Sequence, residues 1–360
     1  MLNNTFVKLA NEKKLTVGYF GGSITEGAGA SDGSKTSYRA RVTKWFRDAF
    51  PDAGITEIQA AIGGTGSDLG MYRCDIDLLS HHPDLVFIEF AVNDNGMTYE
   101  NIIAQTESIY RKILRENPYA DIISVITTTA GIAREIENGG EYVSRSAHIT
   151  TAHHYGVPVL DVGSALHCAV LRSGGDFLTY TADTVHPNDD GYGIYTNIIT
   201  SRLEKWMKEN EASAMLPHKL PEAMSAGARI DAYMIFPTEA ENYISDGFTA
   251  TDESLCGRYP RYIEATVPGA EFSFDFTGET CAFYWMLALD SGNVIVTVDD
   301  LPEISVSSWD LYCEAFNRAG AAFFMPRLTY GKHHVTVRVS AEKAEKSKGT
   351  AIRIGTLMIS

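Results

Sequence analysis

A serine, a histidine and an aspartate in this chain have neighbours that suit nucleophilic catalysis. Ser23 follows two glycines at the end of the apolar run 15–20, and His186 lies three residues after Asp183. Glycine leaves space where another group approaches closely, and a helix that begins at the serine directs unpaired N–H groups toward negative charge on its oxygen. His186 would take the hydroxyl proton while Asp183 holds the other ring nitrogen. The pattern predicts acyl transfer through a covalent serine intermediate.

The oxyanion formed in such a reaction needs hydrogen-bond donors. Suitable groups are the backbone N–H groups of Ser23 and Gly64 and the side-chain amide of Asn93. Gly64 belongs to a glycine-rich turn, whereas Asn93 and Asp94 close an apolar strand. Gly22 and Asp94 adjoin these groups, and we predict that both contact the substrate.

These residues are far apart in the sequence, so a scaffold must bring them together. Up to about residue 210, short apolar runs alternate with amphipathic stretches, which predicts a parallel sheet covered on both faces. The predicted strands are Leu15–Phe20, Ile55–Ile62, Leu85–Val92, Ile122–Thr127 and Val157–Asp161. The predicted helices are Tyr38–Phe50, Ile102–Leu114 and a last helix from about Asp190 to Lys208. Ligands of open parallel sheets bind beyond the carboxyl ends of the strands, where we expect these residues to converge.

The pattern of apolar residues changes to a period of two in the last third of the chain. Such alternation, interrupted by turns, predicts an antiparallel sandwich and is found at residues 272–276, 294–298 and 335–339. We predict a catalytic domain of residues 1–212, a proline-containing linker of residues 213–221 and a sandwich domain of residues 222–360. In the sandwich, Trp285 is interpreted as a core residue.

Composition limits the classes of partner. The chain has 360 residues, of which 44% are hydrophobic, and a formal net charge of −16. This acidic excess argues against nucleic acid and anionic membrane surfaces, which bind clustered Lys and Arg. The sequence has no apolar run of membrane-spanning length and no signal-peptide pattern at its start, which favours a cytoplasmic enzyme. Five scattered cysteines and three adjacent histidine pairs predict neither disulfides nor a metal site, and we expect no cofactor.

Four segments together resemble the SGNH (GDSL-like) hydrolase superfamily, whose blocks centre on serine, glycine, asparagine and histidine in that order. The matching segments are Gly21-Gly22-Ser23-Ile24-Thr25, Ile62-Gly63-Gly64-Thr65, Val92-Asn93-Asp94 and Asp183 to Tyr192. We assign Gly64 as the glycine donor, with Gly63 as the alternative. The resemblance covers about residues 15–205 and implies a three-layer α/β/α domain with a five-stranded, flavodoxin-like parallel sheet. Gly22 stands where aspartate is commoner and Val92 where glycine is usual, which affects substrate fit more than the triad.

The order of domains resembles bacterial carbohydrate esterases that deacetylate plant polysaccharides, such as acetyl-xylan and acetyl-mannan esterases. There the sandwich, which is jelly-roll-like, is a sugar-binding-like module. Its position after the catalytic domain looks more like family seventeen, whose members act on acetylated mannan, than like family two. The resemblance implies an acetylated oligosaccharide as substrate. If Trp309 is exposed, it is our candidate for a sandwich residue that touches this substrate. The oligomeric state stays open, and a homo-oligomer is allowed.

Other functions remain open at this point. The same machinery would serve a lipase or thioesterase, and the sandwich would also suit a carbohydrate-binding protein with a vestigial esterase domain. The glycines from Gly64 to Gly70 are a weak match to a dinucleotide fingerprint. The pattern Gly29-x-Ser31-x-Gly33 matches a nucleophile elbow, but it lies in a loop of small residues without a preceding strand. We expect this loop to flank the cleft.

Overall fold

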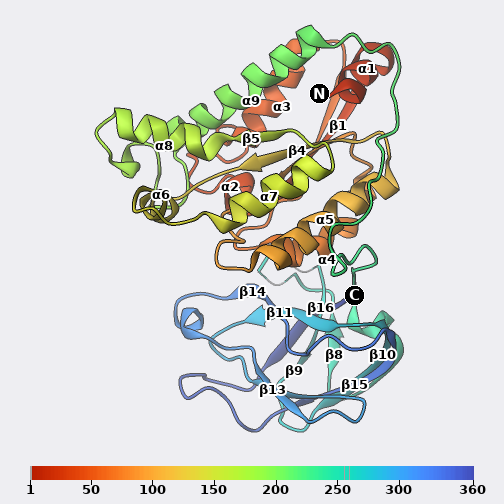
Figure 1. Cartoon of the computed structure of the whole chain (residues 1–360). Coiled ribbons are helices and arrows are strands. Elements are labelled where there is room, and N and C mark those ends of the chain that lie inside the picture. Colours follow the sequence, from red (N-terminus) through yellow and green to blue (C-terminus); the bar gives the residue numbers. More distant parts are fainter. Residues whose placement is uncertain (1, 255, 259) are drawn as a thin grey trace. The chain divides into compact units, whose positions relative to one another are not determined.

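A computed structural model describes residues 2–254, 256–258 and 260–360 of the chain. The predicted catalytic domain begins at Met1, which lies outside these residues. The chain forms two units, and each has its own hydrophobic core (Figure 1). The first contains a parallel sheet with helices, and the second is antiparallel. This confirms the predicted fold class.

The division between the two units falls after residue 230. The sequence predicts a linker at residues 213–221, but this segment lies in the first unit, where hydrogen bonds hold it. Arg111 donates through Nη1 to the carbonyl oxygen of Pro221 (2.8 Å). Two backbone N–H groups just beyond it donate to the buried carboxylate of Glu107 (2.7 and 2.8 Å). These bonds extend the first unit past the predicted linker.

The sheet of the first unit has the strand order β2-β1-β3-β4-β5, and all of its described pairs are parallel. The strands are β1 (Lys14–Gly21), β2 (Gly54–Gln59), β3 (Leu85–Glu89), β4 (Asp121–Ile126) and β5 (Val159–Asp161). Strands β2 and β3 end three residues before their predicted ends. The apolar residues that follow them, such as Ala61 and Phe90, are buried in loops instead.

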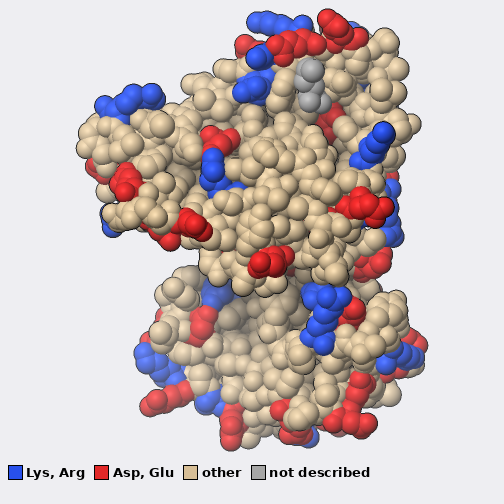
Figure 2. Space-filling view, in the orientation of Figure 1, with Lys and Arg blue, Asp and Glu red and all other residues tan. Residues whose placement is uncertain are grey.

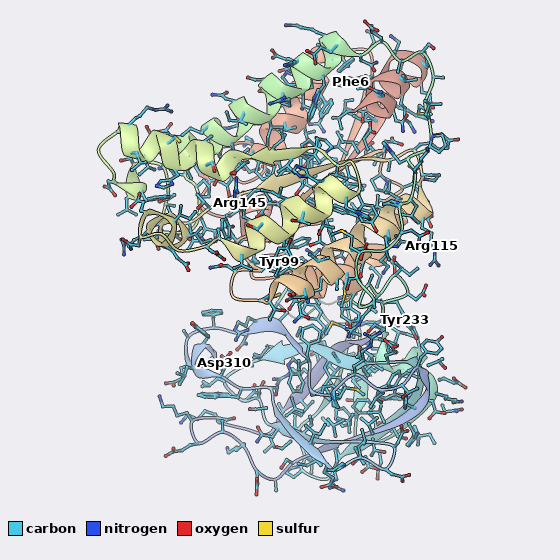
Figure 3. All side chains as sticks on the ribbon, viewed as in Figure 1. Phe6, Tyr99, Arg115, Arg145, Tyr233 and Asp310 are labelled. Atoms are coloured by element: carbon cyan, nitrogen blue, oxygen red, sulfur yellow. The ribbon has the colours of Figure 1, made fainter. Side chains whose placement is uncertain are left out.

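Helices cover both faces of this sheet (Figure 1). They are α1 (Asn3–Glu12), α2 (Ser23–Glu26), α3 (Tyr38–Ala49), α4 (Ser67–Asp77), α5 (Tyr99–Glu116), α6 (Ala130–Glu137), α7 (Val143–His154), α8 (Val162–Arg172) and α9 (Asp189–Glu209), with short 3-10 turns η1 (Leu79–His81) and η2 (Phe177–Thr179). Helices α1, α3, α8 and α9 share one core with alternate strand residues. Helices α4, α5 and α7 pack together. In this second group, Tyr99 Oη donates to Thr150 Oγ1 (2.8 Å), and Arg145 pairs with Asp161 at the end of β5 (2.6 Å; Figure 3).

The second unit consists of two antiparallel sheets around one apolar core. Their strand orders are β13-β12-β15-β10-β7 and β14-β11-β16-β9-β8, with β6 added beside β16. The elements are β6 (Tyr233–Ile235), η3 (Pro237–Glu239), β7 (Glu241–Asp246), β8 (Thr249–Thr251), β9 (Tyr262–Ala265), β10 (Glu271–Gly278), β11 (Cys281–Leu287), β12 (Asn293–Val298), β13 (Ile304–Ser307), η4 (Leu311–Glu314), β14 (Arg318–Ala322), β15 (Gly331–Val339) and β16 (Ile352–Ile359). The predicted alternation is confirmed, because Phe274 pairs with Val335 and both are buried. Trp285 is 1% exposed and lies in this core, as predicted.

Charged side chains of both signs are interspersed on the face of the molecule shown in Figure 2. On this face the Lys and Arg side chains are scattered and do not form a continuous basic stripe. Among the helices of the described residues, none combines the length and the apolar character that spanning a bilayer requires.

Two glycines of α9 provide a matched test of how this helix is seated. A β-carbon on Gly191 would overlap the carbonyl oxygen of Tyr180, whereas one on Gly193 would meet a flexible end of Arg41 at 3.2 Å. Alanine in a helix is favoured over glycine by about 0.5–1 kcal/mol, and overpacking costs about 1–3 kcal/mol. We expect Gly191→Ala to lower the free energy of unfolding in urea and Gly193→Ala to maintain or raise it. Equal changes in the free energy of unfolding for the two variants would contradict this packing of α9.

Candidate active site

The candidate nucleophile lies at the carboxyl end of β1. The strand ends at Gly21, and Ser23 begins the short helix α2 with Gly22 as its N-cap. A β-carbon on Gly21 would lie 2.5 Å from the carbonyl oxygen of Glu89, and one on Gly22 would overlap the side-chain amide of Asn93. Both glycines therefore allow the serine turn to approach β3 and the loop that follows β3.

The side chains of Ser23, His186 and Asp183 meet in one hydrogen-bonded line. Ser23 Oγ lies 2.9 Å from His186 Nε2, and His186 Nδ1 lies 2.8 Å from Asp183 Oδ2. Asp183 Oδ1 also accepts from the backbone N–H groups of His186 and Val185, both at 2.7 Å. These bonds imply the tautomer with its proton on Nδ1, so Nε2 can accept the serine proton. The predicted meeting of these three side chains is present.

The aspartate of this line is held in its ionised form. Partial burial acts to raise the pKa of Asp183, but hydrogen bonds from the His186 ring and from two backbone N–H groups outweigh it and keep the pKa below its ordinary value. The carboxylate therefore faces the imidazole as an anion, which stabilises an imidazolium. The side chain of Asp183 is 57% exposed and that of His186 is 24% exposed, so solvent reaches this part of the site.

The loops after β2 and β3 bring candidate oxyanion donors to the serine. Gly64 has φ of +74°, which glycine adopts without strain, and a β-carbon there would meet nothing within 4 Å. The N–H of Gly63 is already used, because it donates to Glu26 Oε2 (2.8 Å). Asn93 follows β3, and its amide lies against the turn before Ser23. Because the Gly63 N–H is used, Gly64 stays the predicted backbone donor, together with the Ser23 N–H at the start of α2.

A buried arginine that sequence reasoning does not identify joins the serine turn to the glycine turn. Arg73 in α4 donates through Nη2 to the carbonyl oxygen of Gly21 (3.0 Å) and to Thr65 Oγ1 (3.3 Å). Its Nη1 donates to the carbonyl oxygen of Ala60 (2.5 Å). Its guanidinium also lies 4.4 Å from the centre of the Phe20 ring. Asp77 Oδ2 lies 3.0 Å from Nη1 and supplies the opposite charge. Buried charge is tolerated where it is paired and hydrogen-bonded, so Arg73 fixes the ends of β1 and β2 relative to each other.

For Asp94 and Gly22, the structure corrects the prediction of substrate contact. Asp94 is fully buried, and its carboxylate accepts from the backbone N–H of Ser67 (2.7 Å) and pairs with His148 Nε2 (2.8 Å). Gly22 is also buried, and its N–H donates to the carbonyl oxygen of Glu89 (3.3 Å). Because their polar groups are used inside the fold, both residues shape the loops that carry the site.

Glu89, the last residue of β3, is a second buried group that sequence reasoning does not identify. Thr25 Oγ1 donates to Oε2 (2.9 Å), and Thr127 Oγ1 donates to Oε1 (2.7 Å). Burial raises the pKa of Glu89 to about 7, although both threonine bonds act against the rise. Because Thr25 lies in α2 with Ser23, this carboxyl supports the serine helix. A glutamate at the end of an apolar strand is the signal that could have indicated it.

Trp309 belongs to the second unit, between β13 and η4. Its side chain is half-buried, and the indole N–H is buried without a hydrogen-bond partner among the described residues. Substrate contact by Trp309 stays a prediction. Within residues 2–254, 256–258 and 260–360, no group of three or more His, Cys, Asp or Glu side chains could hold a metal ion.

Comparisons with known proteins give a match to one family model and a shared fold. Residues 19–194 match the model of the GDSL-like Lipase/Acylhydrolase family. A solved two-domain esterase (CEX) active on acetylated mannans has a TM-score of 0.85 at 23% identity, covering 100% of this chain and 95% of that one. Its structure co-crystallised with mannopentaose has a TM-score of 0.83 at 23% identity, covering 98% and 93%. No curated protein sequence matches the chain. At this identity, the structural likeness shows the fold alone.

The Glu89 carboxyl makes stability depend on pH. Its pKa is about 7 in the fold against an ordinary 4.5, so between these values the folded chain holds a proton that the unfolded chain has lost. This group therefore lowers the free energy of unfolding as pH rises from about 4.5 to 7, by about 3 kcal/mol in total. We expect the free energy of unfolding of Glu89→Gln, measured with urea, to rise relative to that of the wild-type chain as pH increases from about 5 to about 8. The rise should be about 3 kcal/mol. A constant difference would contradict the assignment.

Proposed function

We propose that the protein, whose residues 19–194 match the model of the GDSL-like lipase/acylhydrolase family, is a serine esterase that removes O-acetyl groups from a carbohydrate. The observation that carries the proposal is the line of Ser23, His186 and Asp183, with bonds of 2.9 and 2.8 Å. A hydroxyl, a base and an orienting acid in this geometry are the groups that acyl transfer to serine requires.

In the first half of the proposed reaction, Ser23 Oγ attacks the carbonyl carbon of the acetyl ester. His186 Nε2 takes the hydroxyl proton, and the ionised Asp183 stabilises the resulting imidazolium. The oxyanion accepts hydrogen bonds from the N–H groups of Ser23 and Gly64 and from the Asn93 amide. Such donors matter most in the transition state, and loss of one typically costs about 10²–10³ in rate. The imidazolium then gives its proton to the sugar oxygen, and the acetyl group stays on Ser23.

In the second half, a water molecule attacks the acetyl-serine ester. His186 takes a proton from this water, the same donors stabilise the second oxyanion, and the proton returns to Ser23 Oγ as acetate leaves. Each proton therefore passes through His186 Nε2. This requirement explains why the Ser23–His186 distance matters in both halves of the cycle.

The carbohydrate part of the proposal has two supports. The chain shares its two-domain architecture from end to end with an esterase active on acetylated mannans, which makes acetylated mannan or xylan oligosaccharides the first substrates to consider. In the second unit, Tyr312 and Phe316 near Trp309 are 64% and 53% exposed. Exposed aromatic rings offer flat apolar faces that suit sugar rings.

Replacement of the nucleophile tests the proposed chemistry. We expect Ser23→Ala to reduce hydrolysis of a chromogenic acetyl ester to background, because no other group forms the acyl intermediate. Asp183→Asn keeps the serine and the oxyanion donors but favours the wrong tautomer, so its rate should fall by up to about 10⁴ and remain measurable. Circular dichroism controls for folding. Undiminished turnover by Ser23→Ala would remove Ser23 from this role.

Substrate choice is tested by release of acetate from acetylated mannan, acetylated xylan and their oligomers. We expect acetate from at least one of these, and a kcat/KM for acetyl esters at least about tenfold above that for octanoyl esters, since each misfitted methylene is worth about tenfold or more. A preference for octanoyl esters would favour a lipid substrate. Sugar binding without ester hydrolysis would favour a binding protein with a vestigial esterase domain.

A further inference from the structure

The loop that follows the serine helix packs directly against the residue that carries the imidazole. Helix α2 ends at Glu26 with Gly27 as its C-cap, and the loop reaches Gly29, whose φ is +84°. A β-carbon on Gly29 would lie 2.5 Å from the carbonyl oxygen of Pro187 and 2.8 Å from His186 Cβ. Because only glycine fits here, the loop and the histidine segment are in direct contact.

Two residues further on, Ser31 is hydrogen-bonded to the first residue of α9. Its backbone N–H donates to Asp189 Oδ1 (2.9 Å), and its hydroxyl donates to Asp189 Oδ2 (2.5 Å). Asp189 is the first residue of α9 and lies three residues after His186. The Ser31 hydroxyl, and then its N–H, hold the pKa of Asp189 below its ordinary value, so the acceptor is a carboxylate at neutral pH.

A buried tyrosine makes the same connection inside the fold. Tyr192 Oη, from the first turns of α9, lies 2.9 Å from the carbonyl oxygen of Ile24 and 2.7 Å from that of Ala28. Ile24 is next to Ser23 in α2. The serine helix is thus tied to α9 from the interior by Tyr192 and from the surface by Ser31.

These contacts matter because the sheet does not hold the histidine. Ser23 lies two residues after the end of β1, whereas His186 lies in the irregular segment between η2 and α9. That segment is held by an isolated bridge between Thr181 and Pro187 and by the bond from Ala182 N–H to the carbonyl oxygen of His186 (2.8 Å). Misplacement of reacting groups by about 1 Å can cost about 10² in rate.

We propose that Ser31 and Asp189 form a latch that keeps the His186 imidazole within hydrogen-bonding reach of Ser23 Oγ. Both are positioning residues, and the proposal rests on the serine esterase function proposed above. It also gives a role to the Gly29-x-Ser31-x-Gly33 pattern. Ser31 of that pattern helps to hold the segment that carries His186, and Ser23 remains the nucleophile.

The test compares Ser31→Ala and Asp189→Ala with Asp190→Ala as a matched control. Asp190 is an exposed acid in the same first turn of α9, so it controls for loss of negative charge at a helix start. We expect kcat for an acetyl ester to fall about tenfold in Asp189→Ala and several-fold in Ser31→Ala, with KM within about twofold. Asp190→Ala should stay within about twofold in both constants. A kcat of Asp189→Ala equal to that of the control would overturn the latch.

A second readout follows the reactivity of the nucleophile without substrate turnover. The rate at which a fluorophosphonate modifies Ser23 depends on His186 as base, so it should slow in Ser31→Ala and Asp189→Ala by about the same factor as kcat. A lower kcat with an unchanged rate of modification would overturn the latch. If circular dichroism shows that Asp189→Ala does not fold, the result for Ser31→Ala, whose substitution lies on an exposed loop, decides whether the latch is retained.

The double variant tests whether the two residues act as a pair. Ser31→Ala with Asp189→Ala should be no slower than Asp189→Ala alone, because both changes remove the same bond. Effects that multiply would overturn the pairing. Wild-type activity that is lost in Ser23→Ala but kept in both latch variants would overturn the latch and leave the esterase proposal intact. A wild-type chain that neither hydrolyses esters nor reacts with the fluorophosphonate would overturn both.

Discussion

The hydrogen bond between Ser23 Oγ and His186 Nε2 joins two residues that are 163 positions apart, and the proposed chemistry depends on its length. Its two ends are held by different means. The sheet positions the serine, because β1 lies between β2 and β3 and ends two residues before it. The histidine depends on contacts between loops and on the start of α9. The nucleophile is therefore positioned by a regular strand, whereas the base is positioned by an irregular segment.

Buried polar groups give the nucleophile side its rigidity. Arg73 donates to the carbonyl oxygens of Gly21 and Ala60 at the ends of β1 and β2, and Glu89 accepts from threonines in α2 and directly after β4. The Asp94 carboxylate accepts from the backbone N–H of Ser67, the first residue of α4. In a medium of low dielectric, satisfied polar networks are strong and specify one arrangement, whereas an unpaired member is costly. The serine turn is thus fixed by bonds that would all have to break together for it to move.

Much of this site could be predicted from the sequence, but the support beneath it could not. Ser23, Asp183 and His186 were identifiable because each carries chemistry in a characteristic local context, and the strands because apolar runs show directly. Helix α4 was not predicted, because seven of its eleven residues are buried and it lacks a polar face. Asp94 was predicted to contact the substrate because it is a carboxylate beside Asn93. Its actual partners, Ser67 and His148, are distant in sequence. Pairings of this kind are decided by tertiary packing.

The division of the chain also places the proposed chemistry in one unit. Every group that the proposed chemistry uses, from Ser23 to His186, lies in the first unit, which has its own core. The second unit folds around a different core, in which aromatic and branched side chains from facing strands pack together. The groups for the proposed transfer of acetyl to Ser23 thus all lie within one unit. Because the proton-transfer groups belong to the core and loops of the first unit, changes of surface residues in the second unit are expected to leave the Ser23–His186 geometry unchanged.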